Sequence, residues 1–207
     1  MSGLIIFLKS VVRFGLKQIF MAGSWLWVHF GGASAQQLEI GSGPVKKTGW
    51  VTLDLCRGVD VYWDLRRGLP FADASFRLVY SSHVLEHFNY KEMQNLLREV
   101  RRVLKPGGIF SICVPDASIY VQAYTGQRST SDLDFYKPAL VSPMKMDLLN
   151  YIFYMDGHHH FMFDSESLAY HCKEAGFVDC KPREFDCSID MVERAPESIY
   201  FICRRTE

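Results

Sequence analysis

Residues with the types and spacing for ligand binding begin at a glycine turn. The apolar run Leu38-Glu39-Ile40 leads into Gly41-Ser42-Gly43, and Asp54 follows at the end of the next apolar run. Glycines let backbone N–H groups approach a ligand closely, because they carry no Cβ atom. A carboxylate after the second strand is placed to accept hydrogen bonds from both ribose hydroxyls. This group predicts a nucleoside-like ligand at the turn. The alternative is a turn that serves only the chain geometry.

The spacing argues against a dinucleotide at this turn. A dinucleotide fingerprint needs three glycines in G-x-G-x-x-G and an acid about 20 residues further on. Here Lys46 stands where the third glycine would be, and Asp54 comes too early. Pro44 and Gly49 also oppose a helix between the two strands. A ligand without a pyrophosphate is therefore preferred.

A second group of chemically active residues is His83-Val84-Leu85-Glu86-His87. Helical spacing would put His83, Glu86 and His87 on one face. An unperturbed imidazole titrates near neutrality, so His83 and His87 are candidate general bases. The alternative is that Glu86 and His87 only cap and brace the fold.

The elements that would position these residues are strands alternating with helices or loops, which predicts an α/β fold with a mainly parallel sheet. Apolar periodicity at three and four predicts a helix at 90–104, with Asn89 as N-cap and Glu92 in a capping box. Asp164 is expected to cap a helix at 165–175. Residues 116–163 lack a clean period and are predicted to be a substrate-side insertion. The expected strands are 36–40, 51–54, 59–63, 76–81, 109–114, 177–185 and 198–204.

Residues 4–30 are strongly apolar and carry Lys9, Arg13 and Lys17 at a spacing of four, so the three cations share one helical face. A helix packed on the domain, a basic amphipathic helix on a membrane surface and a cleaved signal peptide are the open interpretations. Because these charges interrupt the apolar stretch, a spanning helix is disfavoured. We therefore expect an N-terminal helical segment at 1–34 and one domain at 35–207.

The overall composition narrows the function classes. The chain has 23 basic residues (Lys and Arg) and 23 acidic residues (Asp and Glu). This balance gives no support for a nucleic-acid-binding surface. The six cysteines form no C-x-x-C pair, which favours reduced thiols over a disulfide framework or a zinc ribbon. We accordingly expect a cytoplasmic protein, at the inner face of the membrane if the N-terminal helix binds lipid.

Several of these strings, taken in order, resemble class I S-adenosylmethionine-dependent methyltransferases of the type 11 kind. The glycine turn looks like their first motif, and Asp64 with Leu69-Pro70-Phe71 resembles their middle block. His83–His87 and Leu104–Gly108 continue it. The segment from His160 to Phe177 resembles the late block of a bacterial subgroup, many of whose members are associated with polysaccharide or other cell-surface biosynthesis. The resemblance covers about residues 37–205. It implies a Rossmann-like, seven-stranded sheet with an antiparallel last strand, flanked by helices.

The resemblance also implies roles for single residues. Asp54 would hold the ribose hydroxyls, and Asp64 would accept from the adenine amino group with Leu65 beside the ring. The methionine part of S-adenosyl-L-methionine would lie near the glycine turn and the end of the fourth strand, at Glu39, Gly41, Ser42, Gly43 and Ser81 or Ser82. The short link from Gly43 to Asp54 departs from the family, which usually has a full helix there.

The histidines have further interpretations by resemblance. His83-x-x-Glu86-His87 is similar to the Glu-x-x-Glu-His metal motif of some quinone and RNA-end O-methyltransferases, and His158, His159 or His160 would complete such a site. The three consecutive histidines otherwise form a wall of the substrate pocket, as their position before the last helix implies, or are polar loop residues. We predict no resident metal.

The leading functional hypothesis is methylation of an oxygen on a sugar or another small polar acceptor, which is lipid-linked if the N-terminal helix contacts a membrane. A non-catalytic module that binds S-adenosylmethionine is the second hypothesis. An NAD-dependent Rossmann oxidoreductase is the third, and the glycine count disfavours it.

Overall fold

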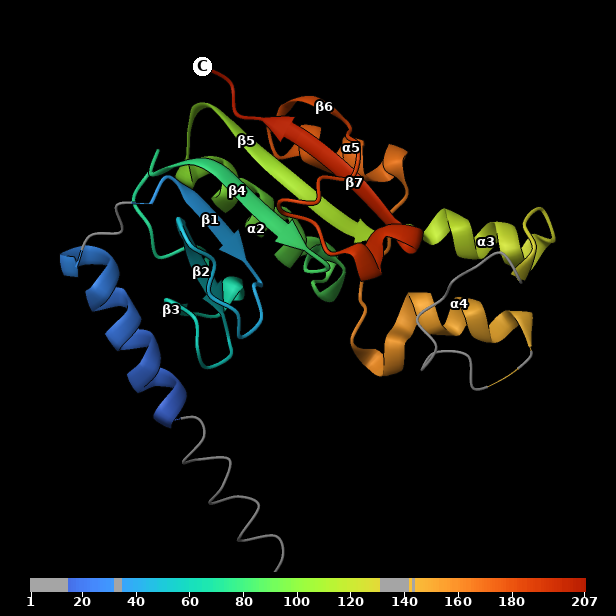
Figure 1. The fold of residues 1–207 in the computed structure, drawn as a ribbon, viewed down its shortest axis with the longest axis horizontal. Coiled ribbons are helices and arrows are strands. Elements are labelled where there is room, and N and C mark those ends of the chain that lie inside the picture. The colour runs from blue at the N-terminus through green and yellow to red at the C-terminus, as the bar shows by residue number, and fades with distance from the viewer. Residues whose placement is uncertain (1–14, 32–34, 131–141, 143) are drawn as a thin grey trace, which may run out of the picture.

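The structure is a computed structural model of the 207-residue chain and describes residues 15–31, 35–130, 142 and 144–207. One seven-stranded sheet forms the centre, in the order β3-β2-β1-β4-β5-β7-β6. Only β7 runs against its two neighbours, and the other pairs are parallel (Figure 1). The predicted Rossmann-like α/β fold with a mainly parallel sheet is confirmed. The strands are β1 (Gln37–Ile40), β2 (Trp50–Asp54), β3 (Val61–Tyr62), β4 (Phe76–Ser82), β5 (Leu104–Pro115), β6 (Val178–Pro182) and β7 (Ser198–Arg204).

Two strands are shorter than their apolar runs predict, and one is longer. β3 covers only Val61–Tyr62, because Asp60 turns inward to accept from the backbone N–H and the hydroxyl of Thr52. β6 ends at Pro182. β5 begins at Leu104, directly after the helix predicted at 90–104, because Leu104 already pairs with Phe76 of β4. The register between the two strands then shifts before Leu78 pairs with Ile109.

Helices α2 (Tyr90–Val103) and α5 (Ser165–Glu174) pack behind the sheet in Figure 1. Both start as predicted. Asn89 and Glu92 form a capping box on α2, and Asp164 and Ser167 form one on α5. Such boxes satisfy N–H groups that the first helical turn leaves without partners. The main apolar core lies between these helices and the sheet, and its residues include Val79, Leu97, Val100, Phe110, Ile112, Leu168 and Phe201.

The opposite face of the sheet carries a polar network. Side chains alternate along a strand, so Tyr80 on β4 and Ser111 on β5 point away from the apolar core. Tyr80 Oη donates to Asp190 at 3.0 Å, and Arg183 Nε donates to Ser111 Oγ at 3.0 Å. The chain that follows β6 thus covers this face with hydrogen bonds.

The described part of the predicted insertion at 116–163 includes helices α3 (Ala117–Thr125) and α4 (Lys145–Tyr154), which pack on each other to one side of the sheet (Figure 1). They share a small apolar cluster separate from the main core, made of Ile119, Tyr120, Ala123, Leu148 and Ile152. The turn Met155–Gly157 then returns the chain toward the sheet. Residues 131–141 and 143 of this segment lie outside the described residues.

Residues 15–26 form a helix that continues as the turn η1 (Trp27–Gly31). The helix lies beside the β3 edge (Figure 1). Ser24 Oγ accepts from Tyr62 N at 2.8 Å, and Phe20 and Tyr62 have ring centroids 5.6 Å apart. Lys9 and Arg13 of the predicted cationic face lie outside the described residues. Within the described ranges, no helix is long and apolar enough to cross a membrane.

Candidate active site

The glycine turn follows β1 and is hydrogen-bonded to the end of β2. Gly41 N donates to the carbonyl of Leu53 at 2.8 Å, and Gly41 has φ +67°. A Cβ atom added there would lie 2.3 Å from Cγ2 of Val84, so a side chain at this position would force Val84 or the turn to shift. Gly43 also has a positive φ, but an added Cβ there would meet nothing within 4 Å. The turn is thus packed on one side and open on the other.

Asp54 lies directly against this turn. Its Oδ2 accepts from Gly43 N at 2.9 Å. Residues 41–49 between β1 and β2 contain no helix, as Pro44 and Gly49 predict. The parallel register, with Ile40 opposite Leu53, nevertheless brings Asp54 to the turn. The short link therefore does not displace the carboxylate.

Two cavities lie on either side of Gly41, Asp54 and His83, which line both of them. The smaller has a volume of about 250 Å³ and the larger about 590 Å³. The remaining walls of the smaller cavity come from Leu55, Trp63, Asp64, Leu65, Arg66, Val84, His87 and Phe88. Those of the larger come from Glu39, Ser42, Gly43, Pro44, Val45, Lys46, Lys47, Ser82, Met191 and Arg194. This division matches an elongated ligand with two chemically different ends.

Asp64 and Leu65 lie on the wall of the smaller cavity. Asp64 caps the turn η2 (Leu65–Arg67) by accepting from Arg66 N at 3.2 Å. Its Oδ2 also accepts from Nζ of Lys17 at 2.8 Å, so the N-terminal helix reaches this wall. Burial acts to raise the pKa of Asp64, but the Lys17 ammonium and the Arg66 N–H outweigh it, and the pKa is lowered. Asp64 is therefore an ionised acceptor.

Glu39, Ser42 and Ser82 lie on the wall of the larger cavity. Burial raises the pKa of Glu39, against the opposing fields of Lys47 and Arg194. Ser82 Oγ and its carbonyl each accept from Nη1 of Arg194 at 2.8 Å. Ser81 differs from its neighbour, because it is fully buried and lines neither cavity.

His83, Glu86 and His87 lie on a single short turn rather than a helix. Only η3 (Leu85–His87) is helical, as one 3-10 turn, and His83 has φ +54°. The expected shared helical face is therefore wrong, yet the side chains still meet. His83 Nδ1 and His87 Nε2 lie 3.8 Å and 3.9 Å from Oε1 of Glu86.

Burial dominates the ionisation of this turn. It lowers the pKa of His83 to about 3, with further lowering by Arg194, and it also lowers the pKa of His87. Burial raises the pKa of Glu86 to about 8, against smaller opposing effects of its own backbone N–H and Arg194. At neutral pH both imidazoles are therefore neutral, because desolvation disfavours the charged form.

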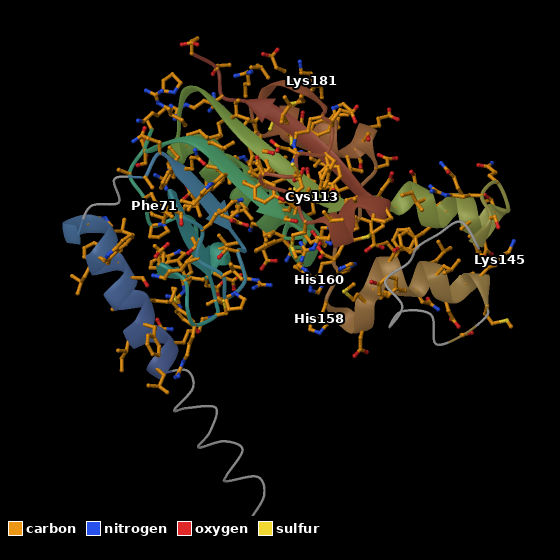
Figure 2. All side chains as sticks on the ribbon, in the orientation of Figure 1. Phe71, Cys113, Lys145, His158, His160 and Lys181 are labelled. Atoms are coloured by element: carbon orange, nitrogen blue, oxygen red, sulfur yellow. The ribbon has the colours of Figure 1, made fainter. Side chains whose placement is uncertain are left out.

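The three consecutive histidines separate in space. His159 is buried, whereas His158 and His160 are exposed, and none of the three lines either cavity. Figure 2 shows His158 and His160 beside the ends of the parallel strands, near the η3 turn. His160 N donates to the carbonyl of Glu86 at 2.8 Å, and the rings of His87 and His159 have centroids 5.2 Å apart. The histidine segment thus lies on the η3 turn.

Some site residues have no signal in the sequence. Lys17 belongs to an apolar N-terminal stretch, and its contact with Asp64 spans 47 positions. Arg194 and Met191 come from a segment without a clear period. Only the tertiary arrangement brings them to the cavities.

Comparison with known proteins finds matches among methyltransferases. The family described as methyltransferase domain matches residues 46–112, from the loop after Gly43 into β5. An uncharacterized methyltransferase of Synechocystis is 42% identical over 48 residues, which span 23% of this chain and 23% of that relative. This chain thus matches less than a quarter of the relative's length.

Solved structures share the fold at low identity. An N1-methyltransferase from Burkholderia thailandensis, solved with 1,6-didemethyltoxoflavin and S-adenosylhomocysteine, superposes with a TM-score of 0.51 at 14% identity, covering 100% of this chain and 87% of that one. A possible histamine N-methyltransferase from Thermotoga maritima gives 0.52 at 17% identity, covering 97% of each chain. The strand order and these neighbours define the fold as that of class I methyltransferases.

Proposed function

We propose that this chain is an S-adenosylmethionine-dependent methyltransferase. The observation that carries the proposal is the glycine turn bound to Asp54 through Gly43 N, with a cavity on each side of it. The family match covers Asp54 and Asp64, and the Burkholderia neighbour binds S-adenosylhomocysteine on the same fold. These findings support the class of reaction, and the acceptor is a separate question.

The residues present fit the two ends of this cofactor. Asp54 would accept from the ribose hydroxyls, and Asp64 from the adenine amino group with Leu65 beside the ring. The methionine end would lie along Glu39 and the turn from Gly41 to Gly43, with Ser82 opposite. Lys17 does not block Asp64, because a carboxylate offers about four lone-pair sites. Glycine at position 41 lets the turn lie close to Val84, because an added Cβ atom would meet the Val84 side chain.

The cofactor supplies a methyl group already activated on a sulfonium, so the protein needs mainly to align the acceptor. His83 lies between the two cavities, and its Nε2 is 2.8 Å from Oγ of Ser198. A neutral imidazole accepts a hydrogen bond or a proton from an acceptor hydroxyl. Its low pKa makes it a weak base, so we assign it chiefly to orienting that hydroxyl.

Calorimetry with S-adenosylhomocysteine tests the cofactor site. Asp54→Ala is expected to abolish binding, and Gly41→Ala to weaken it at least tenfold through the contact with Val84. Gly49→Ala is the matched control, because Gly49 also has a positive φ with open space around it but lines neither cavity. Equal affinities for Asp54→Ala and the wild type would remove Asp54 from the site. Tight binding of NAD instead would overturn the proposal.

For the acceptor, we propose an oxygen of a sugar or another small polar molecule. The larger cavity, which would also hold the methionine end, supports this, because Lys46, Lys47 and Arg194 add cationic side chains to its wall. The sequence resemblance to the surface-polysaccharide subgroup adds to it. Transfer of radiolabelled methyl groups to panels of hydroxyl and amine acceptors tests the assignment. Transfer to amines alone would exclude the oxygen acceptor, and binding without any transfer or hydrolysis would favour a non-catalytic module.

We also propose that the N-terminal helix contacts a membrane surface, which would suit a lipid-linked acceptor. Met21 and Ser24 are buried against the domain, whereas Ile19, Trp25 and Leu26 are 68%, 43% and 51% exposed. Exposed large apolar side chains on a helix favour insertion at a lipid interface. Removing the helix would also remove Lys17 from Asp64. Liposome co-sedimentation of Ile19→Ser/Leu26→Ser against the wild type is therefore the cleaner test, and equal sedimentation would count against membrane contact.

A further inference from the structure

A cluster of potential metal ligands lies beside the smaller cavity. Glu86, His87 and His159 each offer one ligand atom, and these three atoms lie within 4.8 Å of one another. The cluster joins the η3 turn to the segment that returns from α4, through the bond from His160 N to the Glu86 carbonyl. We propose that Glu86, His87 and His159 bind one divalent transition-metal ion, with Zn²⁺ as the best match. Binding itself does not depend on the methyltransferase reaction.

The carboxylate of Glu86 gives the first argument. Its side chain is fully buried, and among the described residues neither Oε1 nor Oε2 has a hydrogen-bond partner. An isolated buried carboxylate costs several kcal/mol unless it is paired, hydrogen-bonded or bound to a metal. Two imidazole nitrogens lie near Oε1, at 3.8 Å in His83 and 3.9 Å in His87. A cation placed among these groups would satisfy the carboxylate.

The hydrogen bonds of the two histidines give the second argument. Nδ1 of His87 lies 2.9 Å from the carbonyl of His158, and Nδ1 of His159 lies 2.7 Å from the carbonyl of Ile152. A carbonyl only accepts, so each Nδ1 carries the proton. In a neutral ring the lone pair is then on Nε2. The Nε2 atom of His87 lies 3.9 Å from Oε1 of Glu86. Metal-ligating histidines are held by this same second hydrogen bond, which fixes ring and tautomer.

The donor set selects the class of ion. Two imidazole nitrogens and one carboxylate match zinc sites with three protein ligands and one open position. Magnesium and calcium prefer oxygen ligands, so they fit less well. In a tetrahedral site with bonds of about 2.0 Å, ligand atoms lie about 3.3 Å apart. The side chains would therefore close inward by about 1 Å around the ion.

The position of the cluster suggests what completes it. His87 also lines the smaller cavity, so the ion would lie at the cavity wall. An oxygen of the acceptor or a water molecule is the class of ligand that fits the fourth position. This last step rests on the proposed function, whereas the three protein ligands do not.

The test is zinc binding by full-length protein purified without a histidine tag. We expect one equivalent of Zn²⁺ by elemental analysis and by calorimetry after chelator treatment. Glu86→Gln and His159→Gln should each weaken binding at least tenfold, while the neighbouring variant His160→Gln keeps wild-type affinity. Zn²⁺ at a hundredfold excess over Kd should raise the Tm of the wild type by about 5–10 °C.

Absorption of the Co²⁺-loaded wild type gives a second readout that needs no variant. Bands of tetrahedral intensity without thiolate charge transfer would support the nitrogen and oxygen ligand set. Absence of stoichiometric zinc, or equal affinity in Glu86→Gln and the wild type, would overturn the metal site. Calorimetry with S-adenosylhomocysteine on the same samples keeps this outcome separate from a failure of the proposed function.

Discussion

Two carboxyl groups in this protein are equally removed from solvent and differ in their partners. The side chains of Asp190 and Glu86 are both 0% exposed. Asp190 accepts from both terminal nitrogens of Arg183, at 2.5 Å and 2.6 Å, and from Tyr80 Oη and Asp186 N. Glu86 has no such partner among the described residues. A carboxylate with these partners is expected to stabilise the fold, whereas one without them is available to the metal ion proposed above.

The physical reason lies in the cost of desolvation. A buried ion pair with satisfied lone pairs is tolerated, because attraction and hydrogen bonds offset the lost hydration. The Asp190 network meets this condition and holds the chain after β6 on the sheet. Glu86 does not meet it, and burial instead raises the pKa of its carboxyl to about 8. Replacing the carboxyl group by an amide should therefore affect stability differently at the two positions.

The largest effect is expected for Asp190→Asn. This change leaves the Arg183 guanidinium without its countercharge on a half-buried face, and breaking a buried pair costs about 3–5 kcal/mol. Urea unfolding at neutral pH measures the loss. A cost below about 1 kcal/mol would mean that the Asp190 network is not structural and would remove the basis of the comparison.

A smaller effect is expected for Tyr80→Phe. The phenol donates one hydrogen bond to Asp190, and its removal should cost about 1–1.5 kcal/mol. Because the two groups are in contact, the double variant with Asp190→Asn should lose less than the sum of the single changes. Strict additivity in this double-mutant cycle would indicate that the hydrogen bond contributes nothing.

A partly exposed and paired carboxyl lies between the two extremes. Oε1 and Oε2 of Glu99 each accept from Arg102 at 2.8 Å, and Leu69 N donates to Oε2. The Arg102 bonds lower the pKa of Glu99, and the Leu69 N–H adds to this against burial and the charge of Asp73. The folded-state pKa lies below the unfolded value, so this stabilisation is present above about pH 4.5 and is lost as pH falls through the folded pKa.

Glu99→Gln should therefore cost about 1 kcal/mol at pH 7, after screening by solvent. The gap from the wild type should narrow as the pH is lowered below about 4.5. Urea midpoints across this range provide the check. A gap that stays constant down to pH 2.5 would show that Glu99 contributes through packing and not through charge.

The smallest effect on stability is expected for Glu86→Gln in the presence of a chelator. No hydrogen bond to another described residue is lost, so the free energy of unfolding should stay within about 1 kcal/mol of the wild type. Thermal and urea unfolding measure it beside Asp190→Asn. A loss as large as that of Asp190→Asn would reveal a structural partner for Glu86 and end the distinction.

The sequence predicted the local features of the fold because they depend on neighbouring residues. The alternation and runs of apolar residues indicated seven strands, and the caps at Asn89 and Asp164 indicated where two helices begin. The composition of residues 41–49 indicated a link without a helix. In each case the controlling interactions lie within a few positions along the chain, so residue order is sufficient.

Only the tertiary structure decided which distant side chains meet. Helical spacing placed His83, Glu86 and His87 on one face, whereas a 3-10 turn and a left-handed His83 bring them together in the structure. The proximity of His159 to Glu86, like the ion pairs of Lys17 with Asp64 and of Arg183 with Asp190, depends on how strands and loops pack. Such contacts are set by burial and partner geometry across the fold, which no local pattern in the sequence records.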